Sequence, residues 1–392
     1  MLNTKFSSWP SFTEEEQAAA QRVLASNRVN YWTGEEGRLF EEEFARWCGS
    51  SHAIAVSNGT LALDLALKAL RIGAGDEVIV TPRTFIASVS TVVNAGARPV
   101  FADVDRNSGN ISPATIAPLI SKRTRAIIPV HLAGWPADMG GIMELARPQG
   151  IRVVEDCAQA HGAKIGEAMV GSIGDVGAWS FCQDKIMTTG GEGGMVTTDD
   201  EQLWSVMWSF KDHGKNWDAV YNRDHPPGFR WVHENFGTNW RMLEVQAAIG
   251  RIQLERMPDW TARRTAIAAR LASALAEFPQ LIRVPMPEAG MTHAFYRLYA
   301  YICPDGLKEG WSRDRIVAEV MAHGVPLYQG SCSEVYLEKA FDDTGLRPAE
   351  RLPVARELGE TSLMCLTHPT LTDAEVEKTC DVLSSVLRDA GA

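Results

Sequence analysis

The stretch SFCQDKIMTTGGEGG, residues 180–194, holds a lysine between a short apolar run and a cluster of glycines. A lysine amine attacks a carbonyl group only when it is neutral, and a desolvating cleft or a nearby cation favours the neutral form. Lys185 could then form a Schiff base, while the glycines within residues 190–194 would let the chain fold closely beside a ligand. Because a solvated lysine beside a glycine turn is the commoner explanation, this motif needs support from others.

A carboxylate in a strand-end position forms the second candidate. In VVEDCAQAHG, residues 153–162, Glu155 and Asp156 end an apolar run. A carboxylate there can pair with a protonated ring nitrogen and keep it protonated, and Gln159 could reach the same ligand from the next turn. A plain capping role for Asp156 would explain the same residues, so the motif alone leaves both interpretations open.

Two helix starts complete the set of local signals. SNGTLALDLALKAL, residues 57–70, begins with residues typical of N-caps. Unpaired N–H groups and the helix dipole make such a start a site for an anion, and Gly59 would let a phosphate approach the backbone; an ordinary N-cap is the alternative. In FGTNWRMLEVQAA, residues 236–248, Asn239 precedes an amphipathic helix that it could cap, and Arg241 could pair with an acid.

Alternating apolar and helical segments predict the scaffold that positions these groups. Short strands separated by helices indicate an α/β fold with a mostly parallel sheet covered on both faces. In such sheets ligands bind beyond the carboxyl ends of the strands. Asp156, Ser180 and Lys185 fall at or just after strand ends, so we expect one cleft to hold all three. The expected strands are residues 52–57, 77–80, 98–104, 124–132, 151–157, 176–181 and 193–198, and the expected helices between them are 60–70, 84–96 and 138–150.

The pattern changes near residue 258, which predicts two domains. Residues 1–258 would form an N-terminal helix, with Thr13 and Glu16 in capping-box spacing, and a large ligand-binding domain. Residues 259–392 would form a smaller α+β domain. Its expected helices are 259–278, 312–324 and 373–391, and its expected strand is 297–303.

The composition narrows the class of protein. The chain has 392 residues, of which 45 % are apolar and 22 % charged, as in ordinary soluble globular proteins of more than one domain. The formal net charge of −11 argues against nucleic-acid and membrane partners. No apolar run approaches the ~18 residues of a membrane span. The seven cysteines form no CxxC pair, which favours the reducing cytoplasm and gives no metal site.

Taken in their order along the chain, these motifs resemble those of the DegT/DnrJ/EryC1/StrS family of sugar aminotransferases. The members of this family are fold-type-I enzymes that use pyridoxal 5′-phosphate (PLP). The likeness covers nearly the whole chain. Besides the lysine loop it runs through YWTGEEGRLFEEEFARWCGSSHAIAVSNGT, GDEVIVTPRTFIASVSTVVNAGARPVFADVD, AIIPVHLAGWPADM, VVEDCAQAHGA and NWRMLEVQAAIGRIQLERM.

The resemblance implies a role for each candidate residue. Lys185 would form the Schiff base with PLP, and Asp156 would pair with the pyridinium nitrogen. Asn239 would reach the phosphate of the partner subunit, which implies a homodimer with shared active sites. The remaining cofactor contacts implied are Gln159 near the phenolic oxygen, Gly59, Thr60 and Ser180 at the phosphate, and Phe85 and Ala158 on the two faces of the ring.

The implied activity is the transfer of an amino group from an amino acid, usually L-glutamate, to a keto group of a nucleotide-linked sugar. Such amino sugars occur in lipopolysaccharides and antibiotics. A cyclitol-ketone aminotransferase and a non-catalytic PLP-binding regulator stay open as alternatives. A PLP-dependent sugar dehydratase is disfavoured because that branch typically has histidine where this chain has Lys185. A Rossmann dehydrogenase is disfavoured because no GxGxxG follows the first expected strand.

Overall fold

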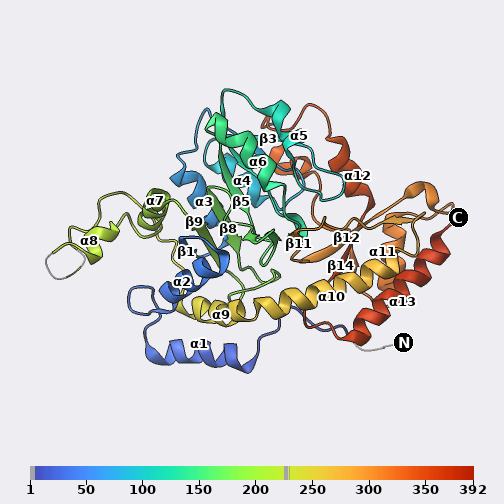
Figure 1. The fold of residues 1–392 in the computed structure, drawn as a ribbon, viewed down its shortest axis with the longest axis horizontal. Coiled ribbons are helices and arrows are strands. Elements are labelled where there is room, and N and C mark those ends of the chain that lie inside the picture. Colours follow the sequence, from blue (N-terminus) through green and yellow to red (C-terminus); the bar gives the residue numbers. More distant parts are fainter. Residues whose placement is uncertain (1–4, 225–227, 229) are drawn as a thin grey trace.

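A computed structural model describes residues 5–224, 228 and 230–392 of the chain. Its centre is a seven-stranded sheet in the order β1-β9-β8-β5-β4-β2-β3 (Figure 1). β9 runs antiparallel to both its neighbours, whereas the other neighbouring pairs are parallel. The mostly parallel sheet predicted from the sequence is therefore confirmed. Its strands are β1 (His52–Val56), β2 (Glu77–Val80), β3 (Arg98–Phe101), β4 (Thr124–Ile128), β5 (Arg152–Asp156), β8 (Val176–Ser180) and β9 (Gly194–Thr198).

Helices cover both faces of this sheet because its strands are apolar on both sides. Val78 and Val80 of β2 pack into the core beneath α3 and α4, whereas Ile79 between them packs on the opposite face with α6 and α12. The helices α2 and α9 pack against β1 and complete the cover of that second face. The helices of this part are α2 (Glu36–Cys48), α3 (Gly59–Ala69), α4 (Ala87–Asn94), α5 (Pro113–Ile116), α6 (Met139–Ala146), α7 (Glu201–Lys211), α8 (Trp217–Tyr221) and α9 (Glu244–Glu255).

A second, antiparallel sheet lies in the C-terminal part, in the order β10-β12-β14-β13. Its core is shared with α10, α11 and α13. The long helix α10 begins at Met257, close to the domain boundary expected at residue 258, and the division into 1–258 and 259–392 stays a prediction. The elements are α10 (Met257–Leu275), β10 (Ile282–Arg283), β12 (Arg297–Ile302), α11 (Arg313–Ala322), β13 (Leu327–Tyr328), α12 (Pro353–Thr361), β14 (Ser362–Leu366) and α13 (Asp373–Ala390).

Two further features connect parts of the chain that are distant in sequence. The first helix, α1 (Glu14–Ser26), has the expected capping box between Thr13 and Glu16 and packs on α9. A three-stranded sheet of β11 (Met291–Thr292), β6 (Lys164–Ile165) and β7 (Ala168–Met169) links the two parts.

Among the described residues, none of the helices has the length and apolar character that crossing a membrane requires.

Candidate active site

One cavity of about 690 Å³ opens where the carboxyl ends of β5 and β8 meet the start of α3. The C-terminal part closes it from the other side with Tyr296, Arg297 and Met364, among others. Asp156, Ser180 and Lys185 are therefore brought together, as expected from their positions at strand ends. The predicted residues that line this cavity are Gly59, Thr60, Phe85, Asp156, Ala158, Gln159, Ser180 and Lys185.

The start of α3 and the end of β8 form a tight cradle. Asn58 caps the helix by accepting a hydrogen bond from the N–H of Leu61. The first N–H groups of a helix have no intrahelical acceptor and favour an anion. A Cβ on Gly59 would lie 2.5 Å from the Cβ of Ser180, so only glycine lets the helix start approach Ser180 this closely. Both the cap and the anion-binding start predicted for this stretch are therefore compatible with the geometry.

Asp156 ends β5 as a buried carboxylate at the cavity wall. Its Oδ2 accepts a hydrogen bond from the Ser88 hydroxyl at 2.7 Å, and its Oδ1 accepts one from the N–H of Ala158 at 3.1 Å. Thr84 in turn lies 2.7 Å from Ser88, hydroxyl to hydroxyl. The local capping contact and the position in the cavity therefore coexist. Sequence analysis did not identify Ser88 and Thr84, because no motif indicates that their hydroxyls lie at the end of a strand.

The wall around Asp156 offers a polar donor and a flat apolar surface. The Gln159 side-chain oxygen accepts a hydrogen bond from the N–H of Ala133 at 2.8 Å, so its amide N–H groups are left to donate to a ligand. Phe85 is 67 % exposed although it is large and apolar. A planar ring stacked on Phe85 would remove that surface from water, and the small Ala158 leaves room beside it.

Lys185 follows β8 in a loop that other parts of the chain hold in place. Its backbone carbonyl accepts a hydrogen bond from the indole N–H of Trp9 at 2.7 Å, and its backbone N–H bonds to the carbonyl of Cys182. Its amine lies 5.4 Å from the centre of the Tyr296 ring. Trp9 and Tyr296 were not predicted, because they are distant in sequence and belong to no motif.

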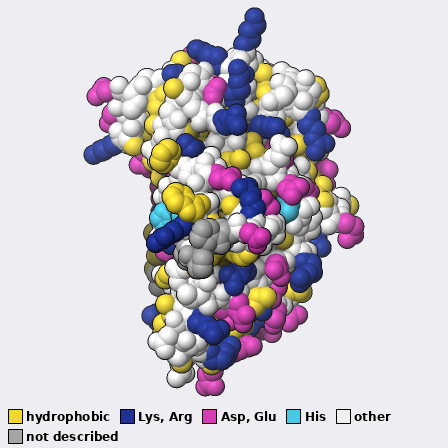
Figure 2. Space-filling model, turned by 90° about the vertical axis from the view of Figure 1, so that its left-hand side faces the viewer, with side chains coloured by type: hydrophobic (Ala, Val, Ile, Leu, Met, Phe, Trp, Pro, Cys, Tyr) yellow, Lys and Arg dark blue, Asp and Glu magenta, His cyan; other side chains and the backbone are white. Residues whose placement is uncertain are grey.

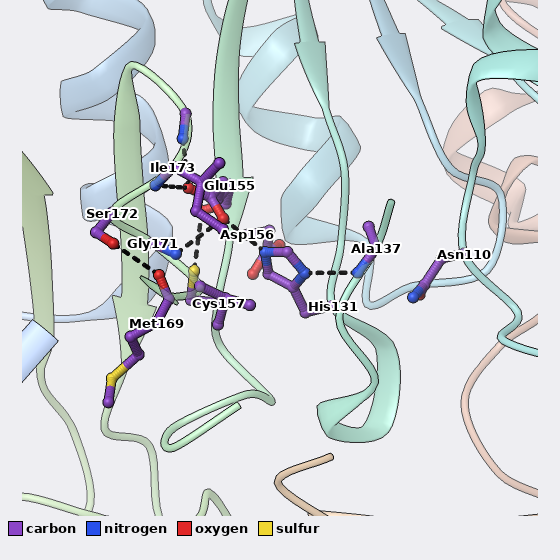
Figure 3. Close-up of polar contacts among 12 residues, drawn as sticks. Asn110, His131, Ala137, Glu155, Asp156, Cys157, Met169, Gly171, Ser172 and Ile173 are labelled. Carbon is purple, nitrogen blue, oxygen red and sulfur yellow. Dashed lines mark hydrogen bonds and ion pairs between the residues drawn. The ribbon is translucent and has the colours of Figure 1, made fainter. Parts of the chain in front are cut away.

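A buried polar cluster lies directly behind Asp156. Figure 3 shows the Glu155 carboxylate between the His131 ring and the loop at residues 171–174. His131 Nδ1 accepts a hydrogen bond from the N–H of Ala137 at 2.9 Å. The proton therefore sits on Nε2, which donates to Glu155 at 3.0 Å. The other donors to the Glu155 carboxylate are the backbone N–H groups of Gly171, Ile173 and Gly174.

This cluster has the composition of a metal site but the bonding of a structural network. Its members His131, Glu155 and Cys157 are all buried. Burial raises the pKa of Glu155, but the hydrogen bonds from His131 and from the backbone donors outweigh burial and lower it overall. Burial raises the pKa of the Cys157 thiol well above its usual value. Because a metal needs an imidazole lone pair and free carboxylate lone pairs, the engaged imidazole and the four donors at Glu155 disfavour it.

Asn239 lies apart from the cavity of its own chain. It is exposed and forms a backbone bridge with Asp212. The alternative that Asn239 caps the following helix is wrong, because α9 begins at Glu244 with Leu243 at its N-cap. The expected pairing of Arg241 with an acid is confirmed, since its guanidinium lies 2.6 Å from the carboxylate of Asp212.

Comparison with known proteins assigns the chain to a family. The model of the DegT/DnrJ/EryC1/StrS aminotransferase family matches residues 10–384. The chain belongs to this family. The resemblance found in the sequence is therefore confirmed, and so are the fold-type-I PLP-transferase class, the aminotransferase activity and the dependence on PLP.

Individual DegT/DnrJ/EryC1/StrS relatives cover nearly the whole chain. The crystal structure of an aminotransferase from Psychrobacter cryohalolentis is 61 % identical, with a TM-score of 0.97 over 98 % of this chain and 99 % of that one. GDP-perosamine synthase of Caulobacter vibrioides is 38 % identical over 91 % of this chain and 92 % of its own. A UDP-N-acetyl-3-dehydro-α-D-glucosamine 3-aminotransferase of Acidithiobacillus ferrooxidans is 36 % identical over 92 % and 90 %, respectively.

Proposed function

We propose that this enzyme transfers an amino group from L-glutamate to a keto group of a nucleotide-linked sugar, for the synthesis of an amino sugar. The observation that carries the proposal is that Lys185, Asp156 and the start of α3 line one cavity in a chain of this aminotransferase family. Two relatives support the substrate class, because their names describe a GDP-linked and a UDP-linked sugar.

The cavity residues fit PLP, whose bound ring withdraws electrons from the carbon that loses a proton. Lys185 would hold the cofactor through its amine. When free, the same amine would serve as the acid–base group that takes the proton from the donor's α-carbon. Asp156 would pair with the ring nitrogen and keep it protonated. The other proposed contacts are Gly59, Thr60 and Ser180 with the phosphate, Phe85 and Ala158 with the ring, and Gln159 with the phenolic oxygen.

Charge on the C-terminal side of the cavity supports anionic substrates. Arg297 lines the cavity and is 9 % exposed. Its guanidinium lies over the Tyr296 ring, 4.1 Å from the ring centre, and Nη1 donates to the Tyr296 carbonyl, so the positive charge is held beside the cavity. Both a donor carboxylate and a sugar diphosphate carry the negative charge that would satisfy this guanidinium.

A homodimer with shared active sites is the second part of the proposal, with Asn239 reaching the phosphate site of the partner subunit. Two observations support it. Asn239 is exposed and does not line its own cavity. Nearby, Trp231 is 81 % exposed and Phe236 is fully exposed. Figure 2 shows the face that carries α7 and α8, where hydrophobic side chains lie among charged ones. Large aromatic side chains are enriched at association surfaces.

The cellular location proposed is the cytoplasm. All seven cysteines are free in the structure, as is usual for proteins of a reducing compartment.

A substrate panel tests the proposed function. The purified enzyme is converted to its pyridoxamine form and mixed with GDP-, UDP- and dTDP-linked keto sugars and with cyclitol ketones, while the cofactor absorbance is followed. We expect a nucleotide-linked sugar to restore the aldehyde form and become aminated. Restoration by a cyclitol ketone alone would favour the alternative acceptor, and restoration by none would contradict the proposal.

A further inference from the structure

Tyr296 contacts the lysine loop at two points. It lies in the C-terminal part, immediately before β12, and is 7 % exposed. Its hydroxyl donates a hydrogen bond of 2.5 Å to Oδ2 of Asp184, the residue before Lys185. Its ring lies 5.4 Å from the Lys185 amine, within the range of a cation–π contact. One side chain therefore touches both the lysine and its neighbour.

The charges around this contact make it a strong one. Burial raises the pKa of the Tyr296 hydroxyl, so the hydroxyl keeps its proton and remains a donor. Burial also raises the pKa of Asp184, but the attraction of Lys185 and the hydrogen bond from Tyr296 lower it below its usual value. The pair is thus a neutral phenol donating to a carboxylate, and hydrogen bonds to ionised acceptors are about twice as strong as neutral ones.

The position of the pair matters because lysine is flexible. A lysine amine sits on a four-carbon stem that loses its rotational freedom only where the surroundings restrict it. Trp9 fixes the backbone of Lys185 from the N-terminal side. The Asp184–Tyr296 hydrogen bond ties the same loop to the C-terminal part, across 112 residues of sequence, and the Tyr296 ring occupies space beside the amine.

We propose that Tyr296 and Asp184 are positioning residues that hold the Lys185 amine in the place from which it binds the cofactor and moves the proton. The hydroxyl fixes the loop, and the ring limits the positions open to the amine. This inference rests on the proposed role of Lys185 in the function above.

The test removes the hydrogen bond from either side. Tyr296→Phe keeps the ring and loses the hydroxyl, Asp184→Ala loses the accepting carboxylate, and the double variant loses both. Tyr336→Phe is the matched control, since the Tyr336 hydroxyl also donates to a carboxylate, Oε1 of Glu334 at 2.7 Å, and neither residue lines the cavity. Each variant is measured for kcat, for KM of the acceptor, for thermal stability, and for visible circular dichroism of the bound cofactor, which reports how the protein holds it.

We expect each single variant to lose about tenfold in kcat, the effect of roughly one charge-assisted hydrogen bond, with KM within about twofold. The double variant should lose little more, because partners in one contact are not additive. The circular dichroism should fall in all three and stay unchanged in the control.

Three results would overturn the positioning role, namely normal kcat and dichroism in both single variants, losses that simply add in the double variant, or an equal loss in Tyr336→Phe. If Tyr296→Phe does not fold, Asp184→Ala removes the same hydrogen bond from the exposed side and decides the question. A failure of the proposed function itself would give a different result from a failure of the positioning role. In that case the cofactor would be attached to a lysine other than Lys185 in the wild-type enzyme.

Discussion

Replacing Glu155 by glutamine should strongly destabilise the protein, although the two side chains have nearly the same shape. Each carboxylate oxygen faces two donors. Oε2 accepts from His131 and Gly171, and Oε1 accepts from Ile173 and Gly174. A glutamine NH₂ group would point at two donors in either orientation. Two buried donors would lose their acceptor, at about 1–3 kcal/mol each, so the expected loss is about 2–6 kcal/mol.

The assay is thermal and urea unfolding of the apoenzyme at several pH values, with Glu167→Gln on an exposed loop as the control. Because the folded-state pKa of Glu155 is lowered, its carboxylate stabilises the wild type fully above the unfolded value near 4.5. This advantage is lost as the pH falls through the folded-state pKa. The difference between wild type and Glu155→Gln should thus be constant from pH 8 to 6 and shrink below about 4.5. A difference under about 1 kcal/mol at pH 7 would refute the network.

Three further variants probe the cofactor site. Gly59→Ala places a Cβ 2.5 Å from the Cβ of Ser180, so the helix start must shift and PLP should bind at least about tenfold more weakly in a cofactor titration; unchanged affinity would exclude Gly59 from the cradle. Asp156→Asn should lose most of kcat while its melting temperature stays close to that of the wild type, because the change removes charge and little shape; near-normal turnover would leave Asp156 with its capping contact alone. Mixing inactive Lys185→Ala and Asn239→Asp subunits should restore activity in up to about half of the sites of each mixed dimer, because one site then carries both defects and the other neither. Demonstrated subunit exchange without recovery would rule out the shared site.

The central sheet could be predicted because its strands are short, apolar and separated by clear helices. Asp156 and Ser180 could be placed in one cleft for the same reason, since parallel strand ends converge at one edge. The strand β14 was missed because it follows α12 with no glycine or proline between them, at Ser362. The two-residue strands β10 and β13 are too short to show any periodicity.

The partners of the candidate residues could not be predicted, because they depend on contacts between distant parts of the chain. Ser88 reaches Asp156 across 68 residues, and Trp9 reaches Lys185 across 176. Such contacts are products of packing and leave no pattern in a single sequence. Asn239 illustrates a local interpretation that failed, because the helix it was expected to cap begins five residues later, at Glu244.

The most direct test of the account is to locate the bond between the enzyme and its cofactor. Borohydride reduction of the purified enzyme should attach PLP irreversibly to one lysine, and peptide mapping should place the label on Lys185. Lys185→Ala should still bind PLP without becoming labelled, and its transamination should nearly vanish, because the amine that moves the proton is gone. A label on any other lysine, or near-normal transamination by Lys185→Ala, would contradict the account.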